Sequence, residues 1–194
     1  MLDTPQGYLS GACQPQELNS SPGAVARFPE AYMDMVRPGL LLYGYGDFAK
    51  GMGLRPAMSL KTTISTIKVY PKGTAISYGG TFVTEDTTRI GVLPYGYADG
   101  FLRSLSNKCS LYTKEGEAKL RGKICMDMCM IDITNMPTVD VGSEVEIFGE
   151  KNPIEKLADC AGTIPYELTC AVSKRVPRLY YLNGQVIERE LMLR

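Results

Sequence analysis

The 194-residue chain contains no histidine and no tryptophan. Without histidine, Ser-His and Cys-His nucleophilic catalysis are excluded, and so is the side chain that most often binds metal ions. Any general base must therefore be a Tyr, Lys, Asp, Glu or Cys side chain.

The chain also has no charge excess and no long apolar run. Its 21 basic and 21 acidic side chains cancel, which argues against nucleic acid and anionic membranes as partners. No apolar run approaches the ~20 residues of a transmembrane helix, and the first residues do not begin a signal peptide. Six cysteines are few for a disulfide scaffold of this length. We therefore expect a cytoplasmic protein with reduced thiols.

Short β-rich segments dominate the chain beyond Arg55. Met58–Val69 places apolar residues on one face and then slips, which predicts a strand with a bulge. Four more strands are expected between Gly, Pro, Asn and Asp turns: Thr88–Leu93, Cys109–Thr113, Met128–Ile133 and Glu144–Phe148. Arg178–Glu190 is expected to form a hairpin around the turn Asn183-Gly184. This spacing indicates an all-β sandwich or barrel.

Two helices are expected after the strands. Asn152 is a candidate N-cap, Pro153 would occupy the first helical position, and Gly162 would end the helix. A second, shorter helix is expected over Pro165–Ser173.

The N-terminal part is less regular. Residues 1–23 show no apolar period, and Ala24–Tyr32 predicts a short helix interrupted by Pro29. Met35–Tyr43 predicts a buried strand. Arg37 is unexpected there, because arginine is seldom buried without a partner.

Ile76–Tyr97 contains two tyrosines, Tyr78 and Tyr97, that each adjoin glycine. Glycine allows a tight turn or close approach of a ligand, and a tyrosine hydroxyl can donate, accept or transfer a proton. Alone, such a pair also fits a packed aromatic residue beside a turn. The nearby Cys125 and Cys129 lack a histidine or a second cysteine pair of matching spacing, so β core is expected there and no metal site.

Six motifs follow one another along the chain: MVRPGLLLYG (35–44), ISYGGTF (76–82), LPYGYADG (93–100), GKICMDMCMID (122–132), PYE (165–167) and KRVPRLYY (174–181). In this order they resemble the bacterial alanine racemase family, which uses pyridoxal 5′-phosphate (PLP) and belongs to fold type III. The resemblance runs from about Ser20 to Tyr181.

The resemblance implies a mainly β chain with two parts. Residues 55–194 would form the family's C-terminal all-β domain, barrel-like or sandwich-like, with two short helices. Residues 1–54 would be the last βα portion of an N-terminal TIM barrel. The family's signature around its PLP lysine, which resembles A-V-V-K-A-N-A-Y-G-H-G, does not occur in these 194 residues.

The resemblance also assigns catalytic and substrate-binding roles. Racemisation needs one acid/base group on each face of Cα, and Tyr78 would serve the face opposite the missing lysine. A phenol acts as a base at neutral pH only where cations or hydrogen bonds stabilise phenolate. The backbone amide of Met126 would bind the substrate carboxylate, and Tyr78 would also contact substrate.

Cofactor contacts are implied for six residues. Arg37 would face the pyridine nitrogen and keep it neutral, because guanidinium only donates hydrogen bonds; pairing with a barrel carboxylate is the alternative. The phosphate would be contacted by Gly39, Leu40 and Tyr166, and by either Ser20 or Ser21 in QELNSSPG, where the family has H-x-A-N-S.

Four further residues match entrance or supporting positions: Tyr97, Arg103, Lys123 and Asp127. Lys123 stands where the family motif G-R-I-C-M-D has arginine, so a bidentate fork becomes a point charge. This change would loosen the entrance or shift substrate preference.

The intact enzyme would interconvert L- and D-alanine, supply D-alanine for peptidoglycan, and form a head-to-tail homodimer with composite active sites. The chain alone is expected to be inactive. Three alternatives stay open: the same architecture acting on serine, as in the C-terminal halves of membrane-bound racemases; PLP binding without racemisation; and a stand-alone β domain that binds a partner and catalyses nothing.

Overall fold

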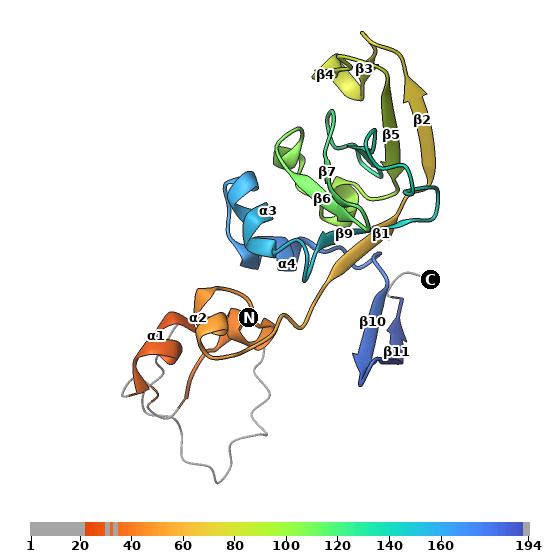
Figure 1. Ribbon diagram of the computed structural model, residues 1–194. Helices are drawn as coiled ribbons and strands as arrows, with labels where there is room; N and C mark the ends of the chain where they lie inside the picture. The colour runs from red at the N-terminus through yellow and green to blue at the C-terminus, as the bar shows by residue number, and fades with distance from the viewer. Residues whose placement is uncertain (1–21, 30–31, 33–34, 192–194) are drawn as a thin grey trace, which may run out of the picture. The chain divides into compact units, whose positions relative to one another are not determined.

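The computed structural model describes residues 22–29, 32 and 35–191 (Figure 1). The chain divides into two compact units, Met1–Ala57 and Met58–Arg194. Among the described helices, none combines the length and the apolarity needed to cross a membrane.

The described part of the N-terminal unit is helical. Its elements are α1 (Pro22–Arg27), the 3-10 helix η2 (Gly39–Tyr43) and α2 (Asp47–Gly51). The strand predicted over Met35–Tyr43 is wrong, because its second half forms η2. Leu40 and Leu41 are buried while Leu42 is 73% exposed, so the apolar run is a helical turn with one outward face. A short apolar run does not distinguish these two structures by periodicity.

The C-terminal unit is mainly β, as predicted, with two short α-helices. Its strands are β1 (Leu60–Thr63), β2 (Thr66–Tyr70), β3 (Ala75–Ile76), β4 (Phe82–Val83), β5 (Thr88–Leu93), β6 (Ser110–Thr113), β7 (Gly116–Lys119), β8 (Cys129–Asp132), β9 (Glu144–Phe148), β10 (Arg178–Leu182) and β11 (Gln185–Glu190). They form antiparallel sheets in the orders β1-β9-β6-β7, β2-β5-β8, β3-β4 and β10-β11 (Figure 1). The described strands are thus divided among four sheets and do not close into one barrel.

The single bulged strand predicted over Met58–Val69 is two strands in two sheets. β1 pairs with β9, and β2 pairs with β5. The break lies at Ile64-Ser65, where Ile64 is 1% exposed. The slip in the apolar pattern therefore marks the place where the chain passes from one sheet to the next. Strand β7 was not predicted, because its sequence, GEAK, carries no run of β-forming side chains.

The first α-helix of this unit, α3 (Ile154–Ala161), begins one residue later than predicted. Pro153 is its N-cap, and Gly162 ends it with φ 73°. Asn152 is 1% exposed, and its side-chain amide donates to the carbonyls of Ile147 (2.7 Å) and Ser110 (3.2 Å). Asn152 therefore stabilises β9 and β6 instead of capping the helix.

Helix α4 (Pro165–Ala171) and the hairpin β10–β11 confirm their predictions. The hairpin turn has positive φ at both central residues, 51° at Asn183 and 78° at Gly184. This is the conformation that an Asn-Gly pair favours.

The core that supports the candidate site lies between β3 and the sheet β2-β5-β8. Ile76, Ile90 and Met130 are its buried members. Tyr70, Phe82, Val92 and Cys125 pack against them and are partly buried. Both strands of the short hairpin β3–β4 therefore pack, through Ile76 and Phe82, against side chains of β5 and β8.

Candidate functional site

Tyr78 lies at the tip of the hairpin β3–β4, in the 3-10 turn η3 (Tyr78–Gly80). Its side chain is 73% exposed, so it is not a packed aromatic residue of this unit. The turn needs unusual backbone angles, with φ 65° at Ser77, 73° at Gly79 and 56° at Gly80. A positive φ is strained for serine. The Ser77 hydroxyl, which donates to the Lys123 carbonyl at 2.7 Å, helps to hold it.

The segment 122–125 packs directly against this turn. A Cβ on Gly122 would lie 2.6 Å from the Ser77 Cβ, so only glycine fits there. A Cβ on Gly79 would lie 3.2 Å from the Lys123 Nζ. The Lys123 ammonium thus lies close to the backbone of the turn that carries Tyr78.

Met126 and Asp127 occupy the centre of a tight turn closed by the Cys125 amide, which donates to the Met128 carbonyl at 2.9 Å. Met126 is 55% exposed, and the side chain of Asp127 is 56% exposed. Met128, which follows, is 45% exposed, and Cys129, the first residue of β8, is 1% exposed. The Cys129 side chain thus faces the core, whereas Met126 and Asp127 at the centre of the turn face outward.

A second loop, 96–99, holds the Met126 turn from the other side. The amides of Tyr97 and Ala98 donate to the carbonyls of Cys125 and Met126, both at 3.0 Å. A Cβ on Gly96 would lie 2.3 Å from the Met126 oxygen, so the close approach requires glycine. Tyr97 is 44% exposed beside this contact.

Arg175 connects the two loops, and the sequence did not indicate this role. Its Nε donates to Asp99 Oδ1 and its Nη2 to Asp127 Oδ1, both at 2.6 Å. These hydrogen bonds, to Asp99 first and then to Asp127, raise the pKa of Arg175 above its ordinary value. Arg175 belongs to the KRVPRLYY motif, so the only signal in the sequence was a basic residue in a motif without an assigned function.

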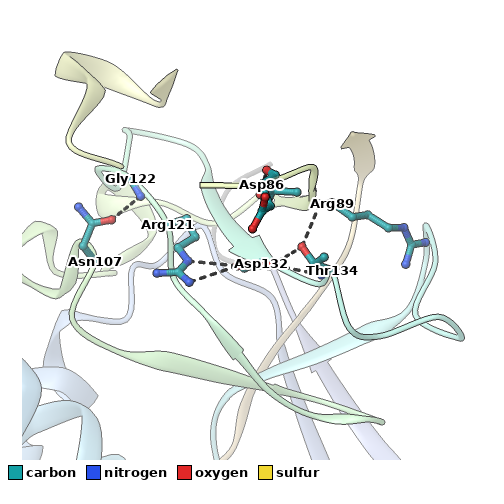
Figure 2. Close-up of polar contacts among 8 residues, drawn as sticks. Asp86, Arg89, Asn107, Arg121, Gly122, Asp132 and Thr134 are labelled. Carbon is teal, nitrogen blue, oxygen red and sulfur yellow. Dashed lines mark hydrogen bonds and ion pairs between the residues drawn. The ribbon is translucent and has the colours of Figure 1, made fainter. Parts of the chain in front are cut away.

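A separate set of contacts connects the hairpin β3–β4, which carries Tyr78, to strand β8. Figure 2 shows Arg121 directed at Asp132, with Nε and Nη2 at 3.3 and 3.2 Å from Oδ2. The Arg121 guanidinium also lies 4.4 Å from the ring centroid of Phe82 in β4. Asp132 accepts a further bond from the Thr134 hydroxyl at 2.6 Å. Arg121 therefore fastens β4 to β8.

Asn107 joins the same hairpin to the Gly122 segment. Its Oδ1 accepts from the Gly122 amide at 2.5 Å (Figure 2), and its Nδ2 donates to the Thr81 hydroxyl at 3.1 Å. The Asn107 side chain thus links the segment that follows Tyr78 to the segment that contains Lys123.

The structure brings five of the predicted site residues into one connected surface: Tyr78, Tyr97, Lys123, Met126 and Asp127. Tyr166 lies on α4 and is 38% exposed. The C-terminal end of α4 adjoins the same surface, because a Cβ on Gly100 would lie 2.1 Å from the Ala171 oxygen. Arg103 lies exposed at the start of the 3-10 helix η5 (Arg103–Leu105).

The remaining predicted residues belong to the N-terminal unit. Arg37 and Gly39 are exposed and Leu40 is buried. The first hydrogen bond of η2 runs from the Leu41 amide to the Pro38 carbonyl, so the amides of Gly39 and Leu40 precede it. Ser20 and Ser21 lie outside the described residues. Within the described ranges, no group of three or more Cys, Asp or Glu side chains is arranged to hold a metal ion.

Residues 57–180 match the family model described as alanine racemase, C-terminal domain. Among curated proteins, alanine racemase 2 of Caldanaerobacter subterraneus subsp. tengcongensis is 44% identical over 173 residues, 86% of this chain and 45% of that protein. Alanine racemase of Clostridium tetani is 46% identical over 173 residues, which are 84% of this chain and 45% of that protein. The chain thus spans about half the length of the curated relatives that it matches.

Solved structures give the same result. Alanine racemase of Clostridium difficile 630, in complex with cycloserine, superposes with a TM-score of 0.81 at 37% identity over 88% of this chain and 46% of that chain. Alanine racemase of Bacillus anthracis with bound L-Ala-P superposes with a TM-score of 0.78 at 32% identity over 87% of this chain and 45% of that chain.

Proposed function

Because this chain belongs to the alanine racemase family and comprises the C-terminal domain of such an enzyme, we propose that it supplies one side of a racemase active site. The intact enzyme interconverts L- and D-alanine. The observation that carries this proposal is the connected surface of Tyr78, Lys123 and Met126, in which Tyr78 and Met126 are exposed and Lys123 is partly buried. Two segments, the turn 77–80 and the segment 122–127, hold an acid/base group, a cation and a substrate-binding turn together there, and none of the three side chains is buried in the core.

Tyr78 moves the proton on one face of the substrate. Tyr78 is 73% exposed, so a substrate can reach it, and the Lys123 ammonium lies beside the turn that carries it. The Met126 amide binds the substrate carboxylate. Tyr97, Asp127, Arg103 and Tyr166 line the entrance through which substrate arrives.

The residues of the N-terminal unit fit PLP as its cofactor. An exposed guanidinium on Arg37 suits the ring nitrogen, and the amides of Gly39 and Leu40, ahead of the first hydrogen bond of η2, suit the phosphate. Tyr166 and Ser20 or Ser21 complete the phosphate contacts. PLP, when bound, withdraws electrons from Cα and makes its proton removable.

The site is completed by a second subunit. Tyr78 and Met126 are exposed on the C-terminal unit and make no contact that buries them within it. We therefore propose a head-to-tail homodimer of the intact enzyme, in which this domain faces the barrel of its partner. Residues 1–54 are then the end of the barrel and residues 55–194 the β domain, in a cytoplasmic enzyme.

A hybrid enzyme tests this function. In the Clostridium difficile 630 alanine racemase, the portion that this chain matches is replaced by the matching portion of this chain, and the remainder of that enzyme supplies what the chain lacks. We expect the hybrid to dimerise, to bind PLP and to racemise alanine, measured by circular dichroism of the substrate.

The same assay separates the rival functions. A serine rate that equals or exceeds the alanine rate would replace alanine as the substrate. A folded hybrid that binds PLP but racemises neither amino acid would leave this domain as a binding module.

A further inference from the structure

Arg175 lies between two aspartates that belong to two different loops of the site. The guanidinium is 2.6 Å from a carboxylate oxygen of Asp99 and 2.6 Å from one of Asp127. The side chain of Asp99 is 12% exposed, that of Arg175 35% and that of Asp127 56%. The bridge thus runs from the interior of the domain to the surface that carries Met126.

The less exposed partner of Arg175 is Asp99, whose hydrogen bonds shape the loop 96–99. The second oxygen of Asp99, Oδ2, accepts from the Gly96 amide at 2.8 Å, and the Asp99 carbonyl accepts from the Ser173 amide at 3.0 Å. Both carboxylate oxygens of Asp99 are therefore engaged. Asp99 therefore binds the Arg175 side chain through one oxygen and the loop 96–99 through the other.

At its outer end, the bridge meets the neighbour of Met126. The amides of Tyr97 and Ala98 hold the turn by its carbonyls at residues 125 and 126, and Arg175 holds it by the Asp127 carboxylate. The contacts form a closed ring: Arg175, Asp99, the loop 96–98, the Met126 turn and Asp127. A ring of this kind resists rotation of the turn, whereas the two backbone bonds alone act as a hinge.

We propose that Arg175 is a positioning residue that closes this ring and fixes the direction of the Met126 amide toward the substrate carboxylate. The inference rests on the proposed function, in which that amide binds the carboxylate. An arginine suits the role because its planar fork can hold two carboxylates at a set angle, whereas lysine offers a point charge. The guanidinium also offsets part of the negative charge of Asp127, which would otherwise repel a carboxylate substrate more strongly.

The first test measures amide hydrogen exchange in the 194-residue chain with Arg175→Met. We expect exchange of the Tyr97 and Ala98 amides to accelerate at least about tenfold while the amides of β5 stay protected, because only the ring opens. Arg175→Lys should give an intermediate rate. Lys156→Met is the matched control, since it removes another 2.6 Å ion pair, to Glu117, outside the site. Unchanged exchange at Tyr97 and Ala98 overturns the proposal.

Asp127→Ala provides a second variant in case Arg175→Met does not fold. It opens the outer link of the ring and leaves the Arg175–Asp99 pair intact. The same acceleration is expected at Ala98, and its absence counts against the ring.

The second test measures alanine racemisation by the hybrid enzyme with Arg175→Met. We expect KM to rise at least about tenfold with kcat within about threefold, since substrate binding is lost while the proton-transfer groups stay. A general loss of folded enzyme would lower kcat instead. An unchanged KM overturns the substrate role of Arg175. An inactive parent hybrid overturns the proposed function itself, and the exchange experiment still decides whether Arg175 holds the loop.

Discussion

Tyr78 is exposed because the backbone on both sides of it adopts conformations that most residues avoid. Ser77 at φ 65° and Gly79 at φ 73° turn the chain so that the phenol points away from the core that Ile76 and Phe82 enter. Strain of this kind persists only where neighbouring contacts hold it, and it gathers at functional sites. Here the contacts are the Ser77 bond to Lys123 and the close packing of Gly122.

Tyr78→Phe in the hybrid enzyme should affect the two enantiomers unequally. A one-sided acid/base group contributes about 10²- to 10⁴-fold to its own proton transfer. We expect exchange of the Cα proton with D₂O to slow by this factor for one enantiomer of alanine and much less for the other. NMR of each enantiomer incubated separately measures it. Equal, small losses for both would show that Tyr78 is not the base on one face.

Two buried thiols make the stability of the C-terminal unit sensitive to alkaline pH. Burial raises the pKa of the Cys109 thiol to about 12 and that of Cys129 well above its ordinary value. Between the unfolded and folded pKa values, the unfolded chain releases a proton that the folded chain retains. Stability is therefore fully present below about pH 8.5 and falls as the pH rises toward 12, by about 1.4 kcal/mol per pH unit for each thiol.

Urea unfolding of the chain between pH 8 and pH 10.5 tests this dependence. Cys109→Ala should lower stability at pH 8, because it leaves a small cavity, but should show a shallower decline with pH than the parent chain. Equal slopes for the two proteins would mean that Cys109 does not carry the effect.

At the scale of elements, the hairpin β3–β4 is too short to hold its own shape. Its strands have two residues each, and an isolated two-stranded hairpin is at best marginally stable. Its geometry comes from other elements: the core beneath Ile76 and Phe82, the Arg121–Asp132 pair, and Asn107. Tyr78, the proposed acid/base group, is therefore positioned by tertiary contacts rather than by its own strand pair.

Arg121→Met should destabilise the chain more than removal of an exposed ion pair. The side chains of Arg121 and Asp132 are 28% and 21% exposed, so the loss leaves a half-buried carboxylate without its cation. We expect the free energy of unfolding to fall by about 1–2 kcal/mol, measured as a lower urea midpoint at constant m. Lys156→Met, which breaks a pair 44% and 46% exposed, should cost no more than about 0.5 kcal/mol. Similar losses of unfolding free energy in both variants would show that Arg121 does not support the hairpin β3–β4.

At the scale of the whole molecule, most of the buried core belongs to the C-terminal unit. In the N-terminal unit, the buried apolar residues among those described are Leu40, Leu41, Tyr45 and Ala49. The residues that lead from one unit to the other, 52–57, are all exposed and belong to no helix or strand. Exposed connectors without regular structure are the preferred sites of proteolytic cleavage.

Limited chymotrypsin digestion should therefore cut first near Met52 and Leu54 and leave a resistant C-terminal fragment. Mass spectrometry identifies the cut, and urea unfolding of residues 58–194 produced separately should show one cooperative transition. Degradation of the C-terminal unit as fast as the N-terminal unit, or a fragment without a transition, would contradict an independently folding β domain.

The local sequence was sufficient wherever neighbouring residues decide the structure. Thr88–Leu93 and Glu144–Phe148 are the strands that their β-forming side chains predicted, and Asn183-Gly184 forms the hairpin turn that its conformational freedom favours. The motifs around Tyr78 and Met126 were likewise sufficient to indicate the family. Each of these conclusions depends on residues a few positions apart.

Tertiary structure decided what depends on distant partners. Asn152 prefers the carbonyls of β9 and β6 to a helix cap, and Met58–Val69 is divided between two sheets because its two halves find different partners. Arg175 is bound to Asp99 and Asp127, which lie 76 and 48 residues away in the chain. Hydrogen bonds over such separations leave no periodic signal in the sequence. The chain therefore specifies its strands and its motifs locally, whereas the geometry that brings the candidate site residues together arises only when the loops pack.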